Sequence, residues 1–303
     1  MTRRCAIEAI TVGGAVSFVS RLLQAAESPS DYTIRSDVRL VLLDVSVTDA
    51  RGSLVAGLPK DSFQVMENGR SQPITVFDNA DIPVTVGLLV DESRSMGPKR
   101  PDVLAAADVF IKESNPRDEM FVLNFNDQVQ RGLPEKELFS DNPRELSAAL
   151  YRGRAAGKTA LNDAIVDGLA LLEQGRREKK TLVLISDGGD NASKHTRPEM
   201  LEKVEASIAT IYTIGLFDED DPDRNPGLLR RLAAVSGGQA YFPPDTTGMI
   251  PICRNIAREI RSRYTIGYVP KPENGTGLRH VQVRVWAAGH KSLHARTRSS
   301  YRY

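Results

Sequence analysis

Residues 84–96 read VTVGLLVDESRSM. The first part, Val84–Val90, is an almost unbroken apolar run, which is typical of a strand buried on both faces of a parallel sheet. The run ends in three oxygen-bearing side chains at alternate positions, Asp91, Ser93 and Ser95. Ligands of open α/β sheets bind beyond the carboxyl ends of the strands. This stretch therefore predicts a central strand and the beginning of a site.

The chain that follows alternates between expected helices and expected strands. Further strands are expected at 120–125, 181–185, 208–216 and 239–242, and helices at 101–113, 143–151, 160–174, 200–207, 226–235 and 246–261. Such alternation predicts a doubly wound α/β fold, in which a mostly parallel sheet carries helices on both faces. We expect this domain to occupy residues 81–263.

The two flanks of this domain are β-rich. Short strands are expected at 37–48, 62–67 and 73–78 on the N-terminal side, and at 264–269 and 281–286 on the C-terminal side. Asn68-Gly69 is a strong hairpin-turn signal. Domain termini often lie close in space. We therefore expect the segments 33–80 and 264–303 to form one small β-rich domain together.

Composition argues against several classes of protein. Of 303 residues, 41% are hydrophobic and 26% charged, as in soluble globular proteins rather than disordered or multispan membrane proteins. Lys and Arg number 40 against 39 Asp and Glu, so the net charge of +1 gives no electrostatic case for a nucleic-acid partner. Two cysteines cannot form a disulfide framework, and four scattered histidines make no zinc motif.

The N-terminus resembles an export signal. Residues 1–26 contain Arg3 and Arg4, an apolar stretch over 9–20 and small residues at Ala25-Ala26, which together predict a secretory signal peptide. The apolar stretch is shorter than the ~20 residues of a membrane span. We expect the protein to be exported to the periplasm, the cell surface or the medium. The alternative is an N-terminal helix with no targeting role.

Three short segments carry the candidate chemistry. Asp91, Ser93 and Ser95 follow the first buried strand, Thr159 ends Gly-Lys-Thr in the loop before the helix at 160, and Asp187 follows the buried strand at 181–185. Carboxylates and hydroxyls are hard oxygen ligands that suit Mg²⁺, with Mn²⁺ or Ca²⁺ as alternatives. Because hydroxyls are neutral, a bound ion stays electrophilic toward an incoming carboxylate.

This ordered set resembles the metal-ion-dependent adhesion site of von Willebrand factor type A domains. The resemblance covers about residues 83–263, and the flanks look like those of a bacterial subfamily in which β segments border the domain. It implies the fold and the metal site more than a biological role, and our first hypothesis is a binding module that presents Mg²⁺ to an Asp or Glu of a partner protein. It implies no particular oligomeric state. Arg94 departs from the family, which usually has Gly there, and places a cation near the site.

Two alternatives use the same residues. The segment Gly153–Thr159 nearly spells a phosphate-binding loop, so a Mg²⁺-dependent nucleotide hydrolase would use Lys158 and Thr159. That loop needs four residues between its first Gly and Gly-Lys, and this chain has three. It must also follow a strand, whereas a helix is expected here. The other alternative is a structural domain with an empty site. The sequence contains no catalytic triad or zinc-protease motif, so we expect no enzyme.

Overall fold

The computed structural model describes residues 40–217, 223–271 and 277–302, which belong to one compact unit. The expected signal peptide, residues 1–26, lies outside the described residues, as does the beginning of the N-terminal β segment. Among the helices that are described, none is long and apolar enough to cross a membrane.

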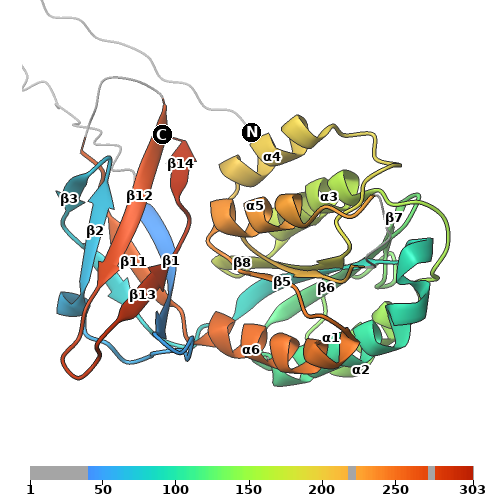
Figure 1. The fold of residues 1–303 in the computed structure, drawn as a ribbon, viewed down its shortest axis with the longest axis horizontal. Coiled ribbons are helices and arrows are strands. Elements are labelled where there is room, and N and C mark those ends of the chain that lie inside the picture. Colours follow the sequence, from blue (N-terminus) through green and yellow to red (C-terminus); the bar gives the residue numbers. More distant parts are fainter. Residues whose placement is uncertain (1–39, 218–222, 272–276, 303) are drawn as a thin grey trace, which may run out of the picture. The chain divides into compact units, whose positions relative to one another are not determined.

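A six-stranded sheet forms the centre of the α/β part (Figure 1). Its order is β10 (Ala240–Tyr241), β9 (Thr210–Gly215), β8 (Lys179–Ser186), β5 (Val84–Asp91), β6 (Glu119–Phe125) and β7 (Val129–Arg131). All neighbours are parallel except the edge strand β7, which runs antiparallel to β6. Every residue of β5 is buried, as its unbroken apolar run predicts. The strand order reverses beside β5, which places a switch point at its carboxyl end.

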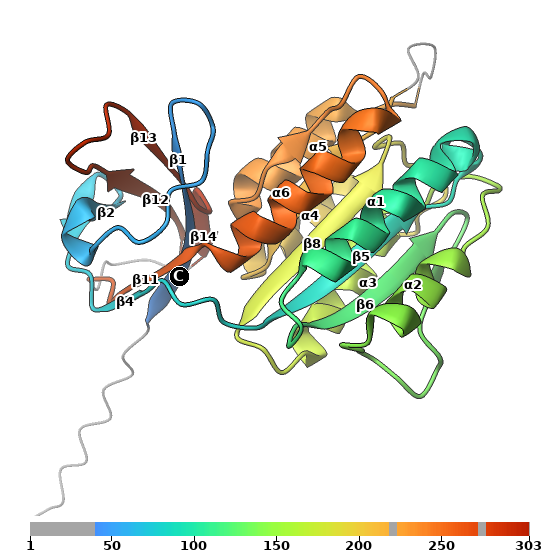
Figure 2. The ribbon, with the colours of Figure 1, turned by 90° about the horizontal axis from the view of Figure 1, so that it is seen from below.

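Helices cover both faces of this sheet. One face carries α1 (Arg100–Glu113), α2 (Pro143–Tyr151) and α6 (Met249–Arg261), and the other carries α3 (Leu161–Gln174), α4 (Arg197–Ala206) and α5 (Pro226–Ser236) (Figures 1 and 2). Short 3₁₀ turns occupy Lys60–Ser62, Arg94–Lys99 and Thr246–Gly248. The predicted doubly wound α/β fold is confirmed. The 3₁₀ turn at 94–99, which contains Ser95, was not expected from the sequence.

The two flanks combine into two four-stranded sheets. One has the order β13 (Leu293–Arg296), β1 (Val41–Asp49), β11 (Tyr264–Tyr268) and β4 (Val76–Asp78), and the other β14 (Ser300–Arg302), β12 (Leu278–Val285), β2 (Phe63–Glu67) and β3 (Arg70–Gln72). Both flanks contribute two strands to each sheet, with β1 antiparallel to β11 and β2 antiparallel to β12. Their inward side chains form a separate hydrophobic core. The expected β-rich domain is therefore built from both ends of the chain. The expected strand at 73–78 begins only at Val76.

A buried acid ties this second core together. Glu67 accepts hydrogen bonds from the hydroxyls of Tyr268 at 2.6 Å and Tyr301 at 2.5 Å, and pairs with Arg279 at 2.8 Å. The four residues come from β2, β11, β14 and β12. Burial and the Glu67 charge raise the pKa of Tyr301 to about 12, so its hydroxyl stays a donor. The hydrogen bonds and the positive charge beside Glu67 therefore offset the cost of burying its carboxylate.

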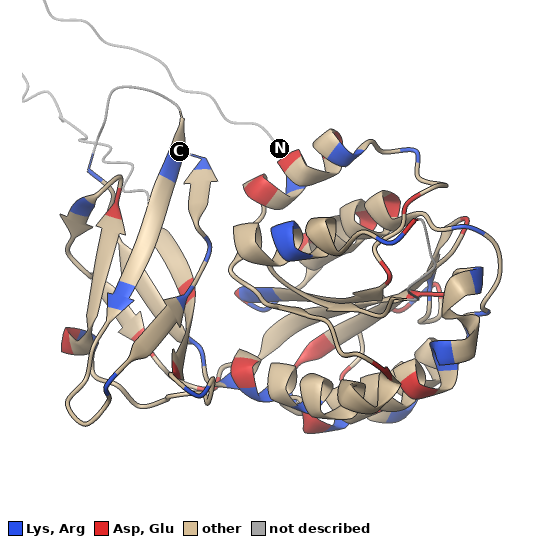
Figure 3. Ribbon diagram, viewed as in Figure 1, with Lys and Arg blue, Asp and Glu red and all other residues tan. Residues whose placement is uncertain are grey.

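Arg263 joins α6 to β11. Its guanidinium is buried and donates to the Thr210 hydroxyl at 2.6 Å, to the Gly237 carbonyl at 2.8 Å and to the Asp44 carbonyl at 3.3 Å. One side chain thus binds the central sheet, the end of α5 and strand β1. Acidic and basic residues are interspersed on the elements around this joint (Figure 3).

Candidate metal centre

Parallel pairing brings the first and third candidate segments together. Strands β5 and β8 are neighbours, with Val90 opposite Ile185. The carboxyl ends of parallel strands lie at the same edge of a sheet, so Asp91 and Asp187 leave the sheet side by side. Both side chains are buried. The pairing of β5 with β8 therefore brings together two acids that lie far apart in the sequence.

Four of the five predicted ligands form a connected cluster. Asp91 accepts from the Ser93 backbone N–H at 2.8 Å. The Ser93 and Ser95 hydroxyls are 3.1 Å apart, and Ser95 donates to Asp187 at 2.6 Å. The alternate positions 91, 93 and 95 do turn toward one another, as the spacing predicts.

Thr159, the fifth predicted ligand, is placed differently. It is buried, and its backbone N–H donates to the Asn191 side chain at 2.9 Å while its carbonyl accepts from the Asn191 N–H at 2.9 Å. These bonds attach the Thr159 loop to the loop that carries Asp187. Across the described chain, no hydrogen bond joins Thr159 to the other four residues. The structure therefore attaches Thr159 to the loop that follows Asp187 and not, by hydrogen bonds, to the other predicted ligands.

The backbone conformation directly after Asp187 requires the glycine at position 188. Its φ of +82° lies in the left-handed region, and a Cβ there would lie 2.8 Å from the Asn225 carbonyl oxygen. Only glycine adopts such a conformation without strain. The Gly188 N–H donates to the Ser186 hydroxyl at 3.0 Å, and the next N–H, of Gly189, donates to Asp187 at 3.0 Å. The turn thus fixes the orientation of the Asp187 carboxylate.

Sequence analysis missed two residues that support the site. Ser186, fully buried at the end of β8, donates its hydroxyl to Asp91 at 2.6 Å. Glu92 is buried beside Asp91 and pairs with Arg100 at 2.7 Å, while its backbone carbonyl accepts from Ala156 at 2.8 Å. Arg100 also donates to the Gly153 carbonyl at 2.6 Å. Ser186 was detectable as the neighbour of Asp187, whereas the Glu92 pair depends on helix α1 and had no sequence signal.

The two acids are electrostatically unfavourable without a cation. Burial and then the charge of Asp187 raise the pKa of Asp91 to about 7, against the lowering effect of hydrogen bonds from Ser186 and Ser93. In the described part of the chain, neither Asp91 nor Asp187 forms an ion pair with Lys or Arg. Like charges held together in a buried place favour a bound cation.

The donor set fits a hard divalent cation. It consists of oxygen atoms only, from two carboxylates and the neighbouring hydroxyls, which Mg²⁺ prefers. Within the described ranges, no three His, Cys, Asp or Glu side chains gather as a metal cluster, so a cation here would rely on hydroxyls as well. Ser95 is half-buried and Arg94 is exposed, so the 94–99 turn is the solvent-facing side of the cluster, whose other side chains are buried.

The near phosphate-binding loop lacks the required context. Residues 153–159 connect α2 to α3 and so follow a helix, and Lys158 is exposed. Phosphate-binding loops of this kind run from a strand into a helix. The local structure therefore does not favour phosphate binding at these residues.

Comparison with known proteins identifies the α/β part. Residues 86–189 match the family model of the von Willebrand factor type A domain. The chain contains a von Willebrand factor type A domain. The matched residues of this vWA domain include all five predicted ligands.

Solved structures share the fold of the vWA domain. A von Willebrand factor type A protein from Catenulispora acidiphila is 15% identical, with a TM-score of 0.53, over 88% of this chain and 74% of that one. The von Willebrand factor domain of Mfa5, a type V pili tip protein from Porphyromonas gingivalis, is 13% identical, with a TM-score of 0.51, over 65% of this chain and 99% of that one. At sequence identities this low, the likeness shows a shared fold and no more.

A sequence relative extends beyond this chain. An uncharacterized protein from Synechocystis sp. is 24% identical over 208 residues, which are 66% of this chain and 46% of that protein. The chain thus spans less than half the length of the curated relative it matches.

Proposed function

We propose that the vWA domain is a metal-dependent protein-binding module. It holds Mg²⁺ through Asp91, Ser93, Ser95, Thr159 and Asp187, and a partner protein supplies an Asp or Glu carboxylate to the metal. The observation that carries this proposal is the cluster of two buried carboxylates, without a basic partner among the described residues, against two serine hydroxyls at the switch point of the sheet. vWA domains often serve in protein–protein interaction and adhesion.

Each residue has a separate role in this proposal. When bound, the cation supplies a positive charge to which a carboxylate of the partner is attracted. Asp91 and Asp187 supply negative charge and are oriented by Ser186 and by the Gly189 N–H. Ser93 and Ser95 add neutral oxygens, so they do not reduce the charge further. The Glu92–Arg100 pair keeps the 152–159 loop beside β5.

We also propose that the protein is exported. The predicted signal at residues 1–26 supports this location, in the periplasm, at the cell surface or in the medium. The Mfa5 protein, whose domain shares the fold, is a component of pili. An exported binding module with an open metal site would meet partner proteins outside the cytoplasm.

Thermal unfolding in EDTA, and then in excess Mg²⁺ or Mn²⁺, tests the metal site. A ligand at about 100 times its Kd stabilises by about 2.7 kcal/mol, a rise of a few degrees at this size. We expect the parent and the control Asp141→Ala, an exposed acid outside the site, to show this rise, and Asp91→Ala to lack it. An equal rise in Asp91→Ala, or none in the parent, would contradict the proposal.

A second readout separates the nucleotide alternative. If ATP stabilises the parent and Lys158→Ala removes the effect, a nucleotide site is present instead. We expect no such effect, because the loop lacks a preceding strand.

A further inference from the structure

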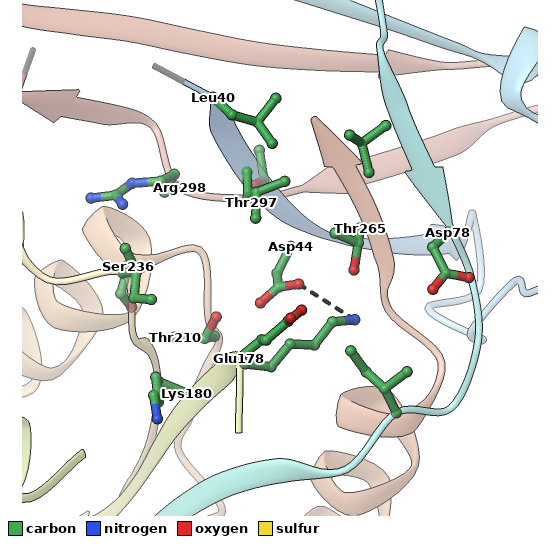
Figure 4. Close-up of a pocket in the computed structure, with 15 residues that line it drawn as sticks. Leu40, Asp44, Asp78, Glu178, Lys180, Thr210, Ser236, Thr265, Thr297 and Arg298 are labelled. Carbon is green, nitrogen blue, oxygen red and sulfur yellow. Dashed lines mark ion pairs between the residues drawn. The ribbon is translucent and has the colours of Figure 1, made fainter. Parts of the chain in front are cut away.

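A cavity of about 380 Å³ lies at the other end of the central sheet from the metal centre (Figure 4). One wall contains Lys179 and Lys180 at the beginning of β8 and Thr210 at the beginning of β9. The other wall is the outer face of the sheet that contains β1, β4 and β11. Its volume is in the range of small-molecule sites, which often lie between packed structural layers.

Exposed apolar side chains gather at this cavity. Leu40, Leu42 and Ile208 line it and are 44%, 49% and 67% exposed. They are three of the nine large apolar side chains that are exposed in the described part of the chain. Val76 and Ile82 extend the same lining. A concentration of exposed apolar groups at a hollow indicates a binding surface rather than scattered surface residues.

The strand pattern explains why these leucines are left uncovered. Successive side chains of a strand point to opposite faces. Leu43 and Val45 of β1 are fully buried in the core of the β-rich domain. Leu42 and Asp44 therefore face the other way, toward the cavity. The sheet thus has one face in its own core and a second face, with both apolar and polar side chains, that lines the cavity.

The basic groups in the lining already have partners. Lys179 pairs with Asp44 at 3.5 Å, as the dashed line in Figure 4 shows. Lys180 donates to the Gly175 carbonyl at 2.7 Å, and Arg298 donates to the Ser300 and Glu205 carbonyls at 2.9 and 3.0 Å. An anionic ligand would therefore have to break these hydrogen bonds to bind Lys180 or Arg298.

Two oxygen-bearing side chains face the space itself. The Asp44 carboxylate and the Thr265 hydroxyl point into it (Figure 4). The two other acids of the lining, Asp78 and Glu178, are exposed. The polar part of the cavity thus suits a hydrogen-bond donor, and the apolar part makes a buried charge costly.

We propose that this cavity binds an uncharged, mostly apolar small molecule that carries one hydroxyl or amide group. The apolar part of the ligand lies on Leu40, Leu42 and Ile208. Its hydroxyl or amide donates to Asp44 or Thr265. The site shares no residue with the metal centre, so it does not depend on the proposed function.

Nile red, an uncharged fluorescent probe, tests the site on the full-length chain. We expect saturable binding of one probe per chain. Among three ligands of equal chain length, 1-decanol should displace the probe at lower concentration than decanoate or decylamine, because only decanol is uncharged. If either charged ligand displaces the probe better than decanol, the proposal is wrong.

Matched leucine variants locate the probe. Leu42→Ser should weaken Nile red binding about tenfold, since part of a leucine's contact area is lost. Leu278→Ser should bind like the parent, because Leu278 is 48% exposed on β12 and does not line the cavity. Both leucines are half exposed, so both variants should fold, which their melting temperatures check. Ile208→Trp, which fills the opening, should also weaken binding. Equal binding by Leu42→Ser and Leu278→Ser would overturn the proposal.

Discussion

Two buried acidic sites in this chain have opposite environments. Glu67, in the β-rich domain, is surrounded by donors: two tyrosine hydroxyls and the guanidinium of Arg279. Asp91, in the vWA domain, lies near a second carboxylate and has hydroxyl and backbone donors but no basic partner in the described chain. The first site is complete within the protein, whereas the cation that we propose would complete the second. Burial alone thus does not distinguish a structural acid from a functional one, and the charge of the neighbours does.

The largest change in stability is expected when the buried Glu67 cluster is broken. Glu67→Gln leaves Arg279 as a buried charge without its acid, and breaking a buried pair costs about 3–5 kcal/mol. We expect the free energy of unfolding in urea to fall by about 3 kcal/mol, with or without metal. The exposed Glu135→Gln should have almost no effect. A loss below about 1 kcal/mol for Glu67→Gln would mean that the buried pair is not needed.

The same change from acid to amide at Asp91 should raise the stability of the protein rather than lower it. Asp91→Asn removes a charge whose pKa is raised to about 7 by burial and by Asp187. At pH 8 in EDTA, we expect the variant to be more stable than the parent by about 1 kcal/mol, since the repulsion is gone. Urea unfolding measures this difference. Destabilisation as large as that of Glu67→Gln would show that the two acids are equivalent.

The metal effect should depend on pH. The pKa of Asp91 in the folded protein, about 7, is above the ordinary value of 3.8 for an aspartate, so metal-free stability falls as pH rises between these values. Bound metal requires the ionised acid. The rise in melting temperature caused by Mg²⁺ should therefore increase from pH 5.5 to 7.5 and then level off. Asp118, whose pKa burial raises to about 6, contributes in both conditions and cancels in the difference. A rise that is the same at all pH values would contradict the role of Asp91.

The smallest effect is expected from a substitution of Arg94, which should change only the affinity for Mg²⁺. The side chain is exposed, so its repulsion of a bound cation is weak and screened by salt. Arg94→Gly, which introduces the residue usual in the family, should strengthen Mg²⁺ binding about threefold at low salt and less at high salt. Calorimetric titration with Mg²⁺ at two salt concentrations measures this change in affinity. Weaker binding by this variant would mean that the arginine supports the loop instead.

Sequence predicted the parts of the molecule that depend on local pattern. The buried apolar runs before Asp91 and Asp187 identified two strands, and the parallel pairing of these strands brings Asp91, Ser93, Ser95 and Asp187 together. Thr159 was assigned by motif alone, and its observed contacts are with Asn191. The Glu67 cluster escaped prediction because its four residues are up to 234 positions apart and meet only through strand pairing of the two flanks.

The central claim is that two buried carboxylates of the vWA domain hold a divalent cation. Mn²⁺ binding, measured by electron paramagnetic resonance with Mg²⁺ as competitor, tests it directly. We expect one Mn²⁺ per chain that Mg²⁺ displaces, retained in Asp141→Asn and lost in Asp187→Asn. No bound Mn²⁺ in the parent, or equal binding by Asp187→Asn, would contradict it.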